Sequence, residues 1–120
     1  MITIIDDDQV FREATSSFIR SLGFSPATFA SAEEFLQSER VRETACLISD
    51  VQMPGMSGIE LQGLLNAQGK RLPIIFVTAF PEMSARQQAL AAGALGFFDK
   101  PFSKEEMILC LRQALGDASA

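Results

Sequence analysis

Short apolar runs recur along this chain, and their spacing predicts five β-strands. Most of them consist of consecutive Ile, Leu, Val, Cys and Phe, with few polar interruptions. Continuous runs of this kind are typical of strands buried on both faces, as in a parallel sheet. Pro26, which cannot donate a hydrogen bond, favours an edge position for the second strand. The five expected strands cover residues 2–5, 25–29, 46–49, 74–77 and 97–99.

Between these runs, apolar residues recur at the three- and four-residue spacing of helices with one buried face. Ser31 and Ser103 are candidate helix caps, each followed three residues later by a glutamate, Glu34 and Glu106. Strand and helix alternating at this length predict an α/β fold, a parallel sheet covered on both faces with right-handed crossovers. The helices are expected around residues 11–22, 32–36, 59–65, 83–92 and 104–115.

Length and composition favour one soluble globular domain. The chain has 120 residues, of which 48% are hydrophobic, and no apolar run approaches a membrane-spanning length. No signal peptide is apparent at the amino terminus. The net charge is −5 and the Lys and Arg residues are scattered, which argues against direct nucleic-acid contact. The small, polar residues 116–120 fit either a free terminus or the start of a linker.

The cysteine and histidine content limits the kinds of catalytic and metal site that this chain can form. Cys46 and Cys110 match no metal-binding spacing, and we interpret them as small buried side chains of a protein in the reducing cytoplasm. The sequence contains no histidine. That absence excludes a phosphohistidine carrier, a serine-type triad and an ordinary catalytic zinc site.

Polar residues suited to phosphoryl chemistry follow four of the five expected strands. The carboxyl ends of parallel strands lie along one sheet edge, where ligands bind in open α/β folds. These residues should therefore converge into one pocket that offers carboxylates, a hydroxyl and an ammonium group. The candidate site residues are Asp6, Asp7, Asp50, Thr78 and Lys100.

The acidic run Asp6–Asp8 favours a cation site. An aspartate that caps the next helix accounts for Asp8, but not for three consecutive acids. Each like-charged pair at about 4 Å costs roughly 1–4 kcal/mol, and Asp50 adds to the repulsion. Mg²⁺ is the natural counter-ion for such oxygen ligands. The Pro- and Gly-containing loop after Asp50 can direct the backbone carbonyl of Gln52 toward the same metal, and a shielded carboxylate can attack phosphorus.

Three further strand-end residues have both a structural and a functional interpretation. Thr78 is an ordinary β-branched strand residue, or its hydroxyl binds a phosphoryl oxygen. Lys100 is a solvated charge, or it pairs with the carboxylates and then with phosphate. Phe97 packs in the core, or it is a partly exposed ring that changes rotamer, since strand alternation places Phe97 and Phe98 on opposite faces.

Five sequence motifs, taken together and in this order, resemble the receiver domain of two-component response regulators. They are Ile-Ile-Asp-Asp-Asp, Ser-Asp-Val-Gln-Met-Pro-Gly-Met-Ser-Gly, Val-Thr-Ala, Ala-Ala-Gly-Ala and Asp-Lys-Pro-Phe, and they extend over nearly the whole chain. The resemblance implies a (βα)₅ flavodoxin-like (CheY-like) three-layer sandwich with a five-stranded parallel sheet. It also implies phosphoryl transfer from the phosphohistidine of a sensor histidine kinase.

The resemblance assigns a role to each matching position. Asp50 would be the phosphoacceptor, and Mg²⁺ (or Mn²⁺) would be held by Asp7, Asp50 and the Gln52 carbonyl, with Asp6 acting through water. Thr78 and Lys100 would bind the phosphoryl oxygens.

Phe97 occupies the position of the family's switch aromatic, often Tyr, and lacks the hydroxyl that a hydrogen-bonded switch requires. Thr78 would move toward the phosphate and Phe97 would fill the space left behind. The responding face would be helix 4, strand 5 and helix 5, with homodimerisation as one outcome.

The sequence segments around Thr78 and Lys100 are most similar to those of the FixJ-type subgroup. Those receivers usually precede a helix-turn-helix output domain that controls transcription, so this chain fits a receiver cut from a longer regulator. A stand-alone receiver, working as a phosphorelay or protein-interaction module, is equally consistent with the residues. The signal, the partner kinase and the isomer of the bond before Pro101 stay open.

Three other functions fit the sequence less well. A haloacid-dehalogenase-like phosphohydrolase would need an acid two residues after the nucleophile, where this chain has Gln52. A flavin or nucleotide module would need a glycine-rich phosphate loop after strand 1, where the chain has three aspartates. A receiver that serves only as a scaffold would not need a competent residue at every site position. We therefore expect a phosphoacceptor rather than a turnover enzyme.

Overall fold

The computed structural model describes residues 1–116. Residues 117–120, which belong to the tail interpreted above as a free terminus or the start of a linker, lie outside that range. Five parallel strands form one sheet in the order β2-β1-β3-β4-β5. The predicted α/β fold is confirmed, including the edge position of the strand that begins at Pro26. The strands are β1 (Ile2–Ile5), β2 (Pro26–Phe29), β3 (Cys46–Asp50), β4 (Ile74–Thr78) and β5 (Gly96–Asp99).

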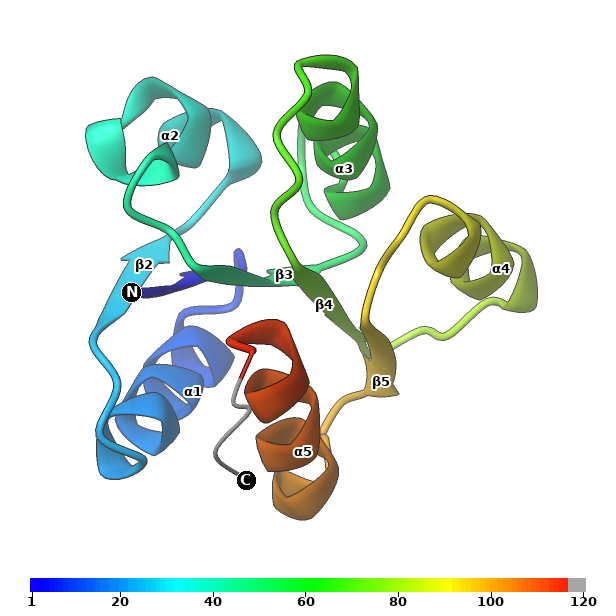
Figure 1. Cartoon of the computed structure of the whole chain (residues 1–120). Coiled ribbons are helices and arrows are strands. Elements are labelled where there is room, and N and C mark those ends of the chain that lie inside the picture. Colours follow the sequence, from blue (N-terminus) through cyan, green and yellow to red (C-terminus); the bar gives the residue numbers. More distant parts are fainter. Residues whose placement is uncertain (117–120) are drawn as a thin grey trace.

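The helices cover both faces of this sheet (Figure 1). The first and the last α-helix lie on one face, and the other α-helices lie on the opposite face. A short 3-10 helix at Glu39–Val41, which the sequence pattern does not indicate, precedes β3. The helices are α1 (Gln9–Ser21), α2 (Ala32–Gln37), α3 (Gly58–Ala67), α4 (Met83–Ala91) and α5 (Lys104–Ala114).

Two hydrophobic cores result, one on each side of the sheet. On the α2–α3–α4 side, fully buried Phe35 and Leu61 pack beneath the strands. On the α1–α5 side, Ile19 and Met107 do the same. Because both faces are covered, the strands must be apolar along their whole length, which explains the continuous hydrophobic runs.

Helix starts are set by local hydrogen bonds. The Asp8 carboxylate accepts from the N–H groups of Val10 (3.0 Å) and Phe11 (3.3 Å), as expected of a cap. Ser31 and Ser103 also cap their helices, but the reciprocal capping box forms elsewhere, between Ser57 and Glu60 at the start of α3. Asp8 begins α1 directly after Asp6 and Asp7, and Ser57 begins α3 at the end of the loop that follows Asp50.

Candidate functional site at the carboxyl edge of the sheet

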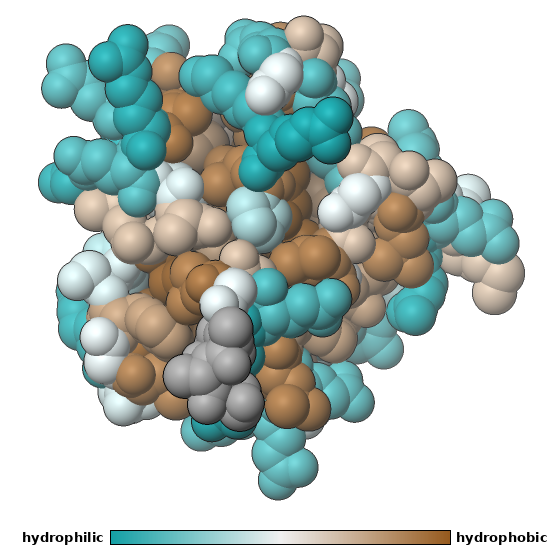
Figure 2. Space-filling view, viewed as in Figure 1, coloured by the Kyte–Doolittle hydropathy of each residue, from teal (hydrophilic) through white to brown (hydrophobic). Residues whose placement is uncertain are grey.

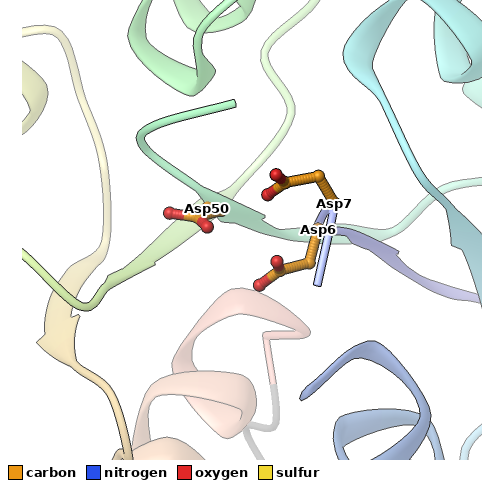
Figure 3. A group of neighbouring side chains, drawn as sticks. All are labelled: Asp6, Asp7 and Asp50. Carbon is orange, nitrogen blue, oxygen red and sulfur yellow. The ribbon is translucent and has the colours of Figure 1, made fainter. Parts of the chain in front are cut away.

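Three carboxylates gather where β1 and β3 end. Asp6 and Asp7 follow β1, Asp50 is the last residue of β3, and one oxygen from each lies within 4.8 Å of the others. Figure 3 shows the three side chains extending from neighbouring strand ends into one region. The parallel pairing of β1 with β3 brings these residues together although more than forty positions separate them. A set of three carboxylates fits a hard divalent cation such as Mg²⁺.

Lys100, just after β5, neutralises part of this negative charge. Its Nζ lies 2.9 Å from Asp6 Oδ2 and 3.0 Å from Asp50 Oδ2. The peptide bond between Lys100 and Pro101 is cis. The lysine ammonium also lies 4.5 Å from the centre of the Phe11 ring, in α1. The ammonium is therefore held between two carboxylates and an aromatic face.

Burial and the ion pairs shift two pKa values at this site. Burial raises the pKa of Asp6 above its ordinary value, although the Lys100 ammonium and the N–H of Asp8 partly offset that rise. Burial also opposes the charge of Lys100, but the Asp6 and Asp50 carboxylates outweigh it and raise the pKa of the lysine. The surroundings as a whole therefore disfavour the charged form of Asp6 and favour the charged form of Lys100. A buried carboxylate whose charge is poorly compensated favours an additional cation nearby.

The loop after β3 folds back over Asp50. Gln52 donates its backbone N–H to Asp50 Oδ1 over 3.2 Å, so the loop begins against the carboxylate. Gln52 is exposed, and it follows Asp50 by two positions in the sequence. This hydrogen bond keeps the Gln52 backbone N–H against the Asp50 carboxylate.

Thr78 and Phe97 lie on the adjoining strands. Thr78, buried at the end of β4, accepts a hydrogen bond from the N–H of Phe80 over 3.1 Å, which leaves its hydroxyl hydrogen to donate. The Phe97 ring is 6% exposed and packs against Phe76 with 6.2 Å between ring centres. Phe97 and Phe98 do belong to opposite cores, and Phe98 is the more exposed of the two. Phe97 is therefore a core residue in this structure.

Sequence reasoning missed three residues that contact this site. Phe11 is recognisable in the sequence only as part of an apolar helical stripe. Arg12 donates to the backbone oxygen of Asp6 over 2.6 Å. Glu33 accepts from the backbone N–H of Met56, in the loop after Asp50, over 2.8 Å. All three are ordinary surface or core residues by local pattern, so only their spatial neighbours reveal these contacts.

Comparison with known proteins identifies the family. The family model described as "Response regulator receiver domain" matches residues 2–112. This chain belongs to the response regulator receiver family. Its receiver fold is CheY-like and FixJ-like, as the sequence motifs indicated.

Several relatives resemble it over nearly its full length. The response regulator protein TodT of Pseudomonas putida is 43% identical over 115 residues, covering 96% of this chain and 51% of TodT. The transcriptional regulatory protein FixJ of Azorhizobium caulinodans is 34% identical over 115 residues, covering 96% of this chain and 54% of FixJ. The chain thus spans about half the length of these relatives.

Solved structures agree with these relationships. The response regulator StyR superposes with a TM-score of 0.88 at 38% identity, over 98% of this chain and 60% of StyR. The FixJ-N structure gives a TM-score of 0.84 at 29% identity, over 99% of this chain and 95% of FixJ-N. Chemotaxis protein CheY4 of Vibrio cholerae gives 0.83 at 28% identity, over 95% of this chain and 97% of CheY4. Receiver domains of this family take part in two-component signalling.

Within residues 1–116, no helix is both long and apolar enough to cross a membrane.

Proposed function

We propose that this receiver accepts a phosphoryl group on Asp50 from the phosphohistidine of a sensor histidine kinase, and that it acts as a phosphoacceptor rather than as a turnover enzyme. The observation that carries the proposal is the position of the Asp50 carboxylate at the end of β3. It lies among the Asp6 and Asp7 oxygens, with Lys100 Nζ 3.0 Å away. Family membership and the completeness of the residue set support the same assignment.

In the proposed step, a carboxylate oxygen of Asp50 attacks the phosphorus atom. The P–N bond to the kinase imidazole breaks, its electron pair stays on the nitrogen, and an acyl phosphate forms on Asp50. Lys100 would exchange its contact with Asp50 Oδ2 for a phosphoryl oxygen, and Thr78 would donate its hydroxyl hydrogen to another. Both residues would compensate the negative charge that arrives with the phosphoryl group.

The acidic cluster would bind Mg²⁺ or Mn²⁺. Asp7, Asp50 and the backbone carbonyl of Gln52 would be direct ligands, and Asp6 would act through water. The bound metal would shield the carboxylates and the phosphoryl oxygens from one another. The support for this is the set of three carboxylate oxygens within 4.8 Å, a donor set that suits hard cations.

The response would pass through Thr78 and Phe97 to the face formed by α4, β5 and α5. Arg86 of α4 donates to the Phe97 backbone oxygen over 3.5 Å, so the two elements are already in contact. Met83, Leu90 and Leu109 are exposed hydrophobic residues of α4 and α5. In Figure 2, hydrophobic and hydrophilic residues are mixed over the part of the surface where these helices lie. This face would contact a second receiver or an output domain.

The output would be transcriptional, as it is for the relative FixJ, a transcriptional regulatory protein. The chain would be one receiver domain of a longer regulator with a C-terminal helix-turn-helix domain. A stand-alone receiver that serves in a phosphorelay is the second candidate. The kinase partner and the free cysteines both fit a cytoplasmic location.

Intact-mass measurement after incubation with acetyl phosphate tests the central proposal. Wild-type protein should gain one phosphoryl adduct with Mg²⁺ and little without it, and Asp50→Asn should gain none while remaining folded. Asp8→Asn, which changes a cap outside the metal cluster, should be modified like the wild type. A full adduct on folded Asp50→Asn would move the acceptor to another residue. Absence of an adduct on wild-type protein, from both acetyl phosphate and a phosphorylated kinase, would contradict phosphoacceptor function.

A further inference from the structure

The loop between β3 and α3, residues 51–57, carries Gln52 and is tied down at its base. The Gly58 N–H donates to the Val51 carbonyl over 2.9 Å, and the Gln52 N–H donates to Asp50 Oδ1 over 3.2 Å. Both contacts are near the ends of the loop. They leave the position of its tip, residues 54–56, to be fixed by something else.

The tip is held by a side chain from α2. The Met56 N–H donates to Glu33 Oε2 over 2.8 Å, across twenty-three residues of sequence. Gly55, at φ +77°, lies directly beside the same carboxylate, since a Cβ built there would come within 2.5 Å of Glu33 Oε2. The left-handed backbone and the absent side chain at Gly55 therefore allow Glu33 to reach the loop.

Glu33 is itself well anchored. Its neighbours in α2, Ala32 and Phe35, are fully buried in the core on that side of the sheet. A carboxylate that accepts from a backbone N–H forms a charge-assisted hydrogen bond, which is stronger than a neutral one. Core packing therefore fixes the position of α2, and the charge of the Glu33 carboxylate strengthens its hydrogen bond to the loop tip.

We infer that Glu33 is a positioning residue for the metal site, and the inference rests on the proposed function. By holding the tip of the loop, Glu33 keeps the Gln52 carbonyl oriented toward the acidic cluster. Groups that orient metal ligands in this way influence metal affinity without contacting the metal. Within residues 1–116, the carboxylates that lie close enough to share a cation are Asp6, Asp7 and Asp50, so Glu33 acts through the loop.

Two variants and one control separate this role from general effects on α2. Glu33→Ala removes the acceptor, and Glu33→Gln keeps an acceptor oxygen without the charge. Glu34→Ala is the matched control, because Glu34 lies next in the same helical turn and contacts Ser31 Oγ over 3.2 Å instead of the loop. Glu34→Ala should lower the stability of α2 and leave the loop in place.

The first measurement is amide hydrogen exchange in metal-free protein, followed by NMR. Exchange at the Met56 N–H should accelerate most in Glu33→Ala and less in Glu33→Gln, whose neutral oxygen accepts a weaker hydrogen bond. It should stay close to wild type in Glu34→Ala. Unchanged exchange at Met56 in Glu33→Ala would overturn the inference, because the loop tip would then be held without Glu33. This result does not depend on any metal or phosphoryl donor.

The second measurement is calorimetric titration with Mg²⁺. Glu33→Ala should weaken Mg²⁺ binding by about tenfold, Glu33→Gln should retain most of the affinity, and Glu34→Ala should match the wild type. Equal Mg²⁺ affinity in Glu33→Ala and wild type would overturn the positioning role and leave the proposed function intact. Failure of the wild-type protein to bind Mg²⁺ would instead contradict the proposed metal site itself.

Discussion

Asp6 is buried beside a second carboxylate, and the metal-free protein must hold that charge at a cost. The Lys100 ammonium compensates it only in part, because the net effect of the surroundings is still to raise the pKa of Asp6. Buried charges without full compensation are expensive, and they persist where function requires them. In our proposal, the function that requires this charge is cation binding.

Asp6→Asn tests this cost through the pH dependence of stability. Because the folded-state pKa of Asp6 lies above the ordinary 3.8, the folded protein binds more protons than the unfolded chain just above pH 3.8. The contribution of Asp6 to the free energy of unfolding should therefore fall as pH rises through that window, by about 1.4 kcal/mol for each unit of pKa elevation. Asp6→Asn should remove this fall and stabilise the metal-free protein at pH 7.

Urea denaturation between pH 3 and pH 7 in the presence of a chelator measures the effect. Asp7→Asn is the control, because it removes one carboxylate of the same cluster from an exposed position. If Asp6→Asn were less stable than wild type at pH 7 and showed the same pH dependence, burial of the charged Asp6 carboxylate would not lower the stability of the protein.

At the scale of elements, the close approach of α3 to β3 determines where the phosphoacceptor lies. A Cβ on Gly58 would overlap the backbone oxygen of Asp50, and it would lie 2.9 Å from the Phe76 ring. Only glycine allows the first turn of α3 to pack against the end of β3 at this distance. The sequence shows Gly58 as a loop glycine, but its reason is this contact between two elements.

Gly58→Ala should therefore destabilise the protein by about 1–3 kcal/mol, because a backbone atom must move to make room. It should also slow phosphorylation of Asp50, whose main chain is the part displaced. Gly63→Ala in the same helix has no heavy atom within 4 Å of the added Cβ and should stabilise by about 0.5–1 kcal/mol. Chemical denaturation of the two variants, together with the mass assay, measures both effects. A Gly58→Ala variant as stable as Gly63→Ala would show that α3 is free to shift.

Helix α4 is held more firmly at its C-terminal end than at its N-terminal end. Gln62 and Asn66 of α3 donate side-chain N–H groups to the carbonyls of Ala89 (2.9 Å) and Ala92 (3.0 Å). The Ala92 carbonyl lies at the helix end, where carbonyl groups lack partners within the helix, whereas the Ala89 carbonyl also accepts from the Ala94 N–H over 3.0 Å. Within the described residues, Glu82 at the other end provides no side-chain cap. The end of α4 that follows Thr78 is thus the less constrained one.

At the scale of the whole molecule, a ligand that binds only the folded state raises its stability. In our proposal Mg²⁺ is such a ligand, because its oxygen ligands come from β1, β3 and the following loop and are separated in the unfolded chain. At one hundred times the Kd, the gain is about 2.7 kcal/mol. The melting temperature of the wild-type protein should therefore rise by several degrees on addition of Mg²⁺.

Thermal melts followed by circular dichroism measure this rise. Asp7→Ala should show a much smaller response to Mg²⁺, whereas Asp8→Ala should start from a lower melting temperature, because α1 loses its cap, and respond fully. Equal stabilisation of Asp7→Ala and wild type would argue against Asp7 as a ligand.

Much of the molecule could be predicted from linear order. The five strands followed from continuous apolar runs, since parallel strands buried on both faces leave a strong local signal. The carboxyl-edge location of Asp6, Asp50 and Lys100 followed from topology, because every strand of a parallel sheet ends at the same edge. These inferences need only the order of elements and the polarity of each residue.

Contacts between side chains of different elements were decided by the folded arrangement. Glu33 has the local pattern of an exposed helix residue, and its bond to the Met56 N–H exists because α2 and the β3–α3 loop meet in space. Phe11 belongs to an apolar stripe, yet its ring lies against Lys100. The local pattern of polar and apolar residues determines whether a side chain is buried or exposed. Which residue of another element it contacts depends on how the helices pack over the sheet. The position of each strand end is thus a local property of the sequence, and the geometry that supports the acidic cluster is a property of the tertiary structure.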